Sequence, residues 1–163
     1  MFDERLLMLA RLTLDEAQQK RLKIATAESC TGGLIAGLLT EIPGSSATVE
    51  RGFIVYSNRA KEEMLNVPGD LIADAGAVSE PVARMMAEGA LEHSRANLAV
   101  AVTGVAGPGG GTPLKPVGLV RLAVARENKP IFHQAMRYGE IGRERIRRET
   151  IATALEMLRK MMA

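Results

Sequence analysis

The chain contains few cysteine, histidine and aromatic residues, on which several classes of protein depend. Its 163 residues include one cysteine, Cys30, so no internal disulfide can form and a reducing compartment is expected. The two histidines, His93 and His133, have no cysteine or carboxylate at ligand spacing, so no metal site is predicted. There is no tryptophan, and two Tyr and three Phe offer few surfaces for stacking nucleic-acid bases. A metalloenzyme and a nucleic-acid-binding module are therefore both disfavoured.

Charge and hydropathy narrow the class further. The 21 Lys and Arg nearly balance the 19 Asp and Glu, and both signs are interleaved along most of the chain. The most basic stretch, residues 143–160, is typical of a solvated helix face rather than a phosphate-binding stripe. No apolar run approaches the roughly 18 residues of a membrane span, and Asp3 and Glu4 stand where a secretory signal would be basic. We expect a cytoplasmic protein that binds neither nucleic acid nor membrane.

The length predicts one domain over residues 1–163, and the alternation of helical and strand periods predicts its class. Helices are expected over 2–20, with a restart at the capping-box sequence Thr13-Leu14-Asp15-Glu16, over about 31–41, from Ser79 onward, and at the C-terminus. Strands are expected at 22–27, 52–56, 98–102, 117–125 and 131–137, the last two as an antiparallel pair. Strands separated by helices predict a three-layer α/β/α sandwich with a mixed, mostly parallel sheet of about five strands.

Polar segments follow two of these strands. The turn at 28–33 follows the first strand and the loop at 103–111 follows the third, so both would lie at the carboxyl edge of the sheet, where ligands bind in such folds. At the first turn an apolar strand meets a hydroxyl-rich segment and then a helix, whose unpaired N–H groups would point at whatever lies above Ser29. The sequence therefore predicts a site for an anion or an oxyanion, with Ser29 and Cys30 as candidate nucleophiles.

Each of these segments also has a purely structural interpretation. The turn at 28–33 would then be a helix cap with two glycines that allow close packing. The glycine-rich loop is neither a P-loop nor a dinucleotide fingerprint, and it either only shapes the chain or admits a ligand against bare backbone. The Gly44-Ser45-Ser46 segment is most simply a turn, although its hydroxyls could hold a phosphate.

Residues 56–61 contain the candidate general base for a hydroxyl nucleophile. Tyr56 at a strand end and Lys61 five residues later are by default a core aromatic and a surface cation. If both turn toward Ser29, an amine with a lowered pKa can take the proton of the hydroxyl, and Tyr56 can relay or orient it. Cys30 competes as nucleophile, because a thiol at a helix N-terminus has a lowered pKa. The residues alone do not separate Ser29 from Cys30.

Five ordered motifs resemble the C-terminal domain of the competence/damage-inducible CinA family. They are AESCTGG at 27–33, GSS at 44–46, RGFIVYSNRAK at 51–61, GAVSEPVARMMAEGAL at 76–91, and TGVAGPGGG followed by KPVG between 103 and 118. The resemblance covers about residues 5–160. Many relatives carry a Gly-Asp-Arg triplet before the last helix, where this chain has Tyr138-Gly139-Glu140-Ile141-Gly142-Arg143. The family also includes two-domain proteins, and this chain looks like a stand-alone member.

The resemblance implies an activity and a set of site residues. Family members include nicotinamide-nucleotide amidohydrolases, which convert nicotinamide mononucleotide (NMN) to nicotinate mononucleotide and ammonia, and no cofactor is expected. The family's catalytic serine, tyrosine and lysine fall on Ser29, Tyr56 and Lys61. Contacts to a nucleotide substrate are expected from Glu28, Cys30, Thr31, Gly32, Gly33, Ser45, Ser46, Asn58, Thr103, Gly104, Ala106 and Gly107.

Two other functions stay open. One is a non-catalytic, nucleotide-binding regulatory module, and the other is an acyl hydrolase that depends on Cys30. Self-association into a homo-oligomer also stays open.

Overall fold

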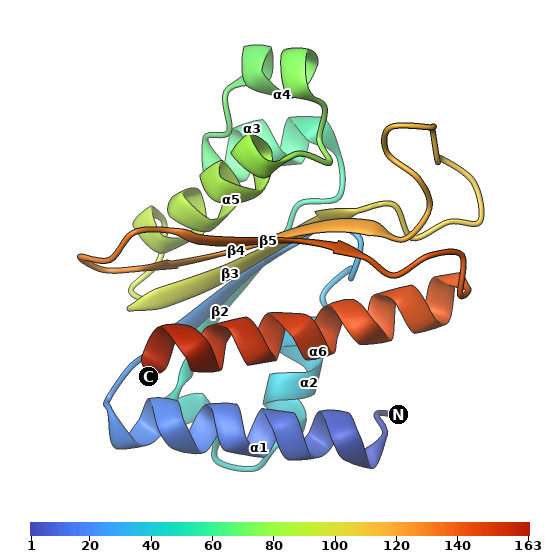
Figure 1. Cartoon of the computed structure of the whole chain (residues 1–163). Coiled ribbons are helices and arrows are strands. Elements are labelled where there is room, and N and C mark those ends of the chain that lie inside the picture. The colour runs from blue at the N-terminus through green and yellow to red at the C-terminus, as the bar shows by residue number, and fades with distance from the viewer.

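A five-stranded sheet forms the middle layer of the computed structural model, which describes residues 1–163 (Figure 1). The strands lie in the order β2-β1-β3-β4-β5. Their bounds are β1 Ile24–Glu28, β2 Val49–Ile54, β3 Leu98–Gly104, β4 Leu119–Arg126 and β5 Phe132–Arg137. Strands β2, β1 and β3 are parallel, whereas β4 runs antiparallel to both β3 and β5. The predicted three-layer fold with a mixed sheet is confirmed.

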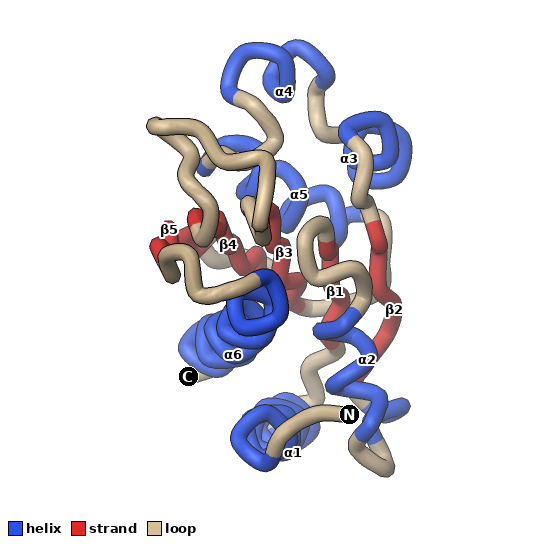
Figure 2. Tube along the Cα trace, turned by 90° about the vertical axis from the view of Figure 1, so that its right-hand side faces the viewer, coloured by secondary structure: helices blue, strands red, loops and turns tan.

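Helices cover both faces of this sheet (Figures 1 and 2). One face carries α1 Glu4–Gln19, α2 Leu34–Glu41 and α6 Arg143–Met162, and the other carries α3 Asn58–Leu65, α4 Gly69–Ala75 and α5 Glu80–Glu92. A single 3-10 turn, η1 Ser45–Ala47, joins α2 to β2. No helix of the fold combines the length and the apolar character needed to span a membrane.

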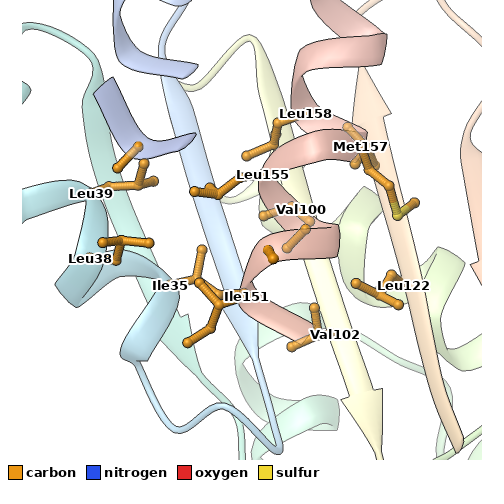
Figure 3. Packing of buried hydrophobic residues seen from close by; sticks show 14 of the residues in the cluster. Ile35, Leu38, Leu39, Val100, Val102, Leu122, Ile151, Leu155, Met157 and Leu158 are labelled. Carbon is orange, nitrogen blue, oxygen red and sulfur yellow. The ribbon is translucent and has the colours of Figure 1, made fainter. Parts of the chain in front are cut away.

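The two faces are packed differently because side chains alternate along a strand. Toward α6, β3 presents Val100 and Val102, which pack with the buried stripe of Ile151 and Leu155 (Figure 3). Toward α5 the neighbouring strands present mainly alanines, namely Ala25, Ala27, Ala99, Ala101, Ala123 and Ala125. The small side chains leave room for α5 to lie close to the sheet. As predicted, β3 is a central strand covered on both faces.

Several predicted boundaries were wrong for local physical reasons. Helix α1 is uninterrupted, because the buried Thr13 donates its hydroxyl to Leu9 O within the helix instead of capping a new one. Helix α2 begins at Leu34 rather than at residue 31, since Gly32 and Gly33 have φ of +59° and +100°. Strand β2 begins and ends earlier than 52–56, and helices α3 and α4 were not predicted.

Candidate active site

A cavity of about 210 Å³ opens where β1 and β3 end. It brings together eight residues expected at the site from the sequence, which are Ser29, Cys30, Tyr56, Asn58, Lys61, Thr103, Gly104 and Ala106. Ala77, Val78 and Arg143 complete the lining. The cavity therefore lies at the carboxyl edge of the parallel strands, where the polar turns indicated a site.

Ser29 and Lys61 form the polar centre of this cavity. Lys61 Nζ lies 3.1 Å from Ser29 Oγ, 3.0 Å from Val55 O and 3.1 Å from Tyr56 O. Lys61 is only 1% exposed, whereas Tyr56 is 64% exposed. The default interpretation of this pair, a core aromatic and a surface cation, is thus reversed.

The position of Lys61 on α3 directs its amine inward. The N-cap Ser57 accepts a hydrogen bond from Ala60 N at 3.0 Å, which sets the start of the helix at Asn58, one turn before Lys61. Burial lowers the pKa of Lys61, and no carboxylate forms an ion pair with it. A neutral amine has two N–H groups for the carbonyls of Val55 and Tyr56, which leaves its lone pair for the Ser29 hydroxyl. The arrangement suits removal of the Ser29 proton by Lys61.

Cys30 is a poor nucleophile in this setting. The residue is 6% exposed, and burial is the main cause that raises the pKa of its thiol to about 11. At neutral pH the thiol is protonated, and the thiolate is the reactive form. The lowered thiol pKa that was expected at a helix N-terminus is wrong, because desolvation outweighs the backbone hydrogen bond and the positive charge of Arg147 that act to lower it.

Glu28 does not line the cavity and instead caps α2. Its buried carboxylate accepts hydrogen bonds from Thr31 Oγ1 at 2.6 Å, Ile35 N at 2.8 Å and Ala36 N at 3.0 Å. The helical N–H groups that were expected to bind an anion are thus already occupied. The amide N–H groups of Cys30, Thr31 and Gly33, in the turn before the helix, donate to no acceptor on another residue, and of these three residues Cys30 alone lines the cavity. The Cys30 N–H is therefore the backbone donor of this turn that remains for an oxyanion in the cavity.

The glycines of the same turn serve packing rather than contact with a ligand. The Gly32 N–H donates to Ser29 O, and a side chain on Gly33 would meet Ile54 at 2.9 Å. Neither residue lines the cavity, and neither does Thr31, whose side chain faces Glu28. In contrast, Gly104 lines the cavity and must be glycine, because a Cβ there would lie 2.9 Å from Leu119 O.

Ser45 and Ser46 lie at the opposite edge of the sheet from Ser29. They form η1, which is followed by Thr48, whose carbonyl accepts a hydrogen bond from the N–H of Ile24. Ile24 begins β1, whereas Ser29 follows its last residue. The expectation that Ser45 and Ser46 contact a ligand of this cavity is therefore not met, because the length of β1 separates them from it.

Arg143 is one of three cavity-lining residues that the sequence did not assign to the site. Its Nη1 donates to Gly107 O at 2.7 Å, and its Nη2 lies 3.5 Å from the Tyr56 hydroxyl. Arg143 thereby connects the glycine-rich loop to the rim of the cavity. Gly107, which was expected at the site, does not line the cavity, and its carbonyl accepts the hydrogen bond from Arg143. The sequence did contain a signal for Arg143. Many relatives carry a Gly-Asp-Arg triplet before the last helix, and this chain has an arginine in the same region at a different spacing.

Ala77 and Val78 were missed as well. Thr103 Oγ1 donates to Ala77 O at 3.0 Å and so fastens the segment before α5 to the end of β3. No group of three or more His, Cys, Asp and Glu side chains could hold a metal ion.

The fold and the cavity define an α/β domain that holds a serine hydroxyl against a buried lysine amine. The family model described as CinA C-terminal domain matches residues 7–162, and the chain belongs to this family.

Relatives and solved structures agree with this assignment. A putative competence-damage inducible protein of Caldicellulosiruptor bescii is 46% identical over 153 residues, covering 94% of this chain but 37% of the relative. A CinA-like protein of Akkermansia muciniphila is 63% identical over 107 residues, covering 66% of this chain and 26% of the relative. The chain thus matches only 26% to 37% of the length of these relatives. The crystal structure of the competence/damage inducible protein CihA from Agrobacterium tumefaciens is 56% identical with a TM-score of 0.95, covering 97% of this chain and 96% of that one.

Proposed function

We propose that this protein hydrolyses the carboxamide of a nicotinamide nucleotide, with NMN as the expected substrate and nicotinate mononucleotide and ammonia as products. The substrate class comes from the family resemblance. The observation that carries the chemistry is the buried Lys61 amine 3.1 Å from the Ser29 hydroxyl, with two carbonyls to hold its N–H groups. We propose the cytoplasm as its compartment, in keeping with one free, buried cysteine.

The first half of the reaction forms an acyl-enzyme. Neutral Lys61 takes the proton of Ser29 as Oγ attacks the amide carbon, and the N–H group of Cys30 stabilises the oxyanion. The protonated Lys61 then gives this proton to the leaving nitrogen, the C–N bond breaks, and ammonia departs. The electron-withdrawing pyridinium ring makes the amide carbon more electrophilic.

The second half returns the enzyme to its starting state. Lys61, neutral again, takes a proton from water as the water oxygen attacks the ester carbon. The bond to Ser29 Oγ breaks and Oγ recovers its proton from Lys61. The carboxylic acid that forms loses its remaining proton to solvent and leaves as nicotinate. Every proton transfer to or from Ser29, the leaving nitrogen and the attacking water passes through one amine, so no cofactor is required.

Tyr56 and Arg143 are assigned to the nucleotide rather than to proton transfer. The Tyr56 hydroxyl is exposed and contacts Arg143, and it makes no hydrogen bond with Ser29. The Arg143 guanidinium is the permanent cation of the cavity lining, and guanidinium groups bind phosphate well. We infer that the pyridinium lies deep in the cavity near Ser29 and that the phosphate lies at the rim near Arg143.

Ammonia release from a panel of amides tests this function. NMN, nicotinamide riboside, nicotinamide and NAD are incubated with the protein at equal concentration, and ammonia is measured. We expect NMN to have the highest kcat/KM and the riboside, which lacks the phosphate, to be weaker chiefly through KM. Binding of NMN without ammonia release would favour the regulatory module. Release that iodoacetamide abolishes by alkylating Cys30 would favour the thiol enzyme.

A further inference from the structure

Lys115 fastens the loop between β3 and β4 to the end of α4. The loop rises on the α4 side of the sheet (Figures 1 and 2). The Lys115 amine donates to Ala75 O, and a Cβ added to Gly76 would lie 2.5 Å from its Nζ. Ala75 is the last residue of α4, where a backbone carbonyl has no partner within the helix. The loop thus supplies the cation that caps this helix.

The two carbonyls after that of Ala75 are held as well. Gly76 O accepts a hydrogen bond from Ser79 Oγ at 2.8 Å, and Ala77 O accepts one from Thr103 Oγ1 at 3.0 Å. Three consecutive carbonyls are therefore held by side chains of a loop, a helix N-cap and a strand end. Without the first of these bonds the chain is free to turn about Gly76, which has a φ of +80° and no side chain to restrict it.

The segment held in this way is an apolar wall of the cavity beside Ser29. Ala77 and Val78 line the cavity together with Ala106, so they supply carbon surface next to its polar centre. A planar ring bound near Ser29 needs such a surface, because ligand sites orient a ring by apolar contact and fix it with a few polar groups. Lys115 does not line the cavity, so it can act on a ligand only through this wall.

We propose that Lys115 is a positioning residue for substrate binding: through Ala75 it holds the wall formed by Ala77 and Val78 against the ring of the substrate. The proposal rests on the proposed function for the identity of that ring. The wall is remote from the bonds that change, so it contributes equally to binding of the ground state and of the transition state. The expected signature is a rise in KM with little change in kcat.

Lys115→Met removes the amine, and Lys129→Met is the matched control. Lys129 is exposed in the turn between β4 and β5. We expect KM for NMN to rise about 3- to 10-fold in Lys115→Met with kcat within about twofold, and both constants to stay within about twofold in the control. Loss of folded protein alone would lower kcat and leave KM unchanged, so KM separates positioning from stability. An unchanged KM in folded Lys115→Met overturns the proposal.

Chemical restoration tests whether the amine itself holds the wall. Lys115→Cys treated with 2-bromoethylamine carries an amine at nearly the reach of lysine, whereas treatment with iodoethane adds an uncharged ethyl group. Wild-type protein treated in the same way controls for reaction at Cys30. KM should return to within about twofold of wild type with the amine and stay raised with the ethyl group. A KM that stays raised after both treatments overturns the role of the amine.

Binding to a protein without the Ser29 hydroxyl keeps this proposal distinct from the proposed function. Calorimetry measures Kd for NMN in Ser29→Ala with and without Lys115→Met, and we expect Kd about 3- to 10-fold higher in the double variant. If wild-type protein releases no ammonia but Kd rises in this way, the proposed reaction fails and the positioning role of Lys115 stands. If ammonia is released and Kd is unchanged, the positioning role fails alone. If NMN neither binds nor reacts, both fail.

Discussion

Glu28 and Ser29 are neighbours in the chain, and their side chains serve opposite faces of the sheet. The Glu28 carboxylate accepts hydrogen bonds from the N–H groups of Ile35 and Ala36 on α2, whereas Ser29 Oγ lies 3.1 Å from Lys61 Nζ on α3. The alternation of side chains at the end of β1 produces this division. The Glu28 carboxylate thus holds the turn to α2 on one face of the sheet, and the Ser29 hydroxyl lies beside Lys61 on the other.

Replacement of Glu28 by glutamine should destabilise the fold. Both carboxylate oxygens of Glu28 accept backbone N–H groups, and in Glu28→Gln a side-chain NH₂ would face one of these donors. An unsatisfied buried donor costs about 1–3 kcal/mol, so the free energy of unfolding in urea should fall by about that amount. Glu41→Gln, at the exposed end of the same helix, is the control and should change stability by less than about 0.5 kcal/mol. Equal effects of the two changes would show that Glu28 does not anchor α2.

Lys61→Arg tests whether the amine acts as a base. Arginine keeps the positive charge but does not give up its proton in proteins, so it cannot accept the proton of Ser29. We expect kcat on NMN to fall about 10²- to 10⁴-fold, to nearly the level of Lys61→Met. Wild-type kcat should rise with pH and level off at a pKa below 10.5, since burial lowers the pKa of Lys61. Should Lys61→Arg keep most of its turnover, the lysine would act only through its charge.

The same lysine should make stability depend on pH. Because burial lowers its pKa in the folded state, the folded protein binds fewer protons than the unfolded chain between that lowered value and 10.5. Over this pH window the free energy of unfolding rises with pH because of Lys61. Below the window Lys61 is protonated in both states, and the full free-energy cost of burying its charge lowers the stability of the folded protein. The gain in unfolding free energy of Lys61→Met over wild type should therefore be larger at pH 7 than at pH 10. Denaturant titrations at both pH values measure it, and a gain that grows with pH would contradict the direction of the shift.

Removal of divalent metal should leave the activity unchanged. The chain places no three His, Cys, Asp or Glu side chains where they could share an ion, and the proposed proton transfers use Lys61 alone. Ammonia release is measured before and after incubation with EDTA. Loss of activity that one divalent ion restores would mean that a metal takes part in the reaction.

Much of the fold follows from periodicity in the sequence. Strand β3, the β4–β5 pair and the stripe of α6 were predicted because each shows an uninterrupted apolar run or a clear helical repeat. Helix α3 was missed for a physical reason. It is short and mostly polar, and one of the two residues that it buries is Lys61, the other being Leu65. A rule that treats every lysine as a surface residue cannot find such a helix.

The site was predictable to the extent that it is local. The turn after β1 and the loop after β3 lie at one edge because the two strands are parallel neighbours, which the pattern of strands and helices indicates. Arg143 and Arg147 approach from α6 at the far end of the chain, and spacing does not reveal which face of the helix meets the turn. Ser45 and Ser46 were misplaced because a family motif does not say at which end of a strand it lies.

Ammonia release from NMN by Ser29→Ala and Cys30→Ala, assayed side by side, tests the central claim most directly. Both side chains are small and lie next to each other in one turn, so their replacement by alanine should disturb the fold to a similar, small extent. Thermal unfolding of each variant checks that it is folded. The account predicts that Ser29→Ala loses activity by several decades, whereas Cys30→Ala, which removes a protonated thiol, retains most of it. A folded Ser29→Ala with near-normal turnover, or an inactive Cys30→Ala beside it, would contradict the assignment of Ser29 as the nucleophile.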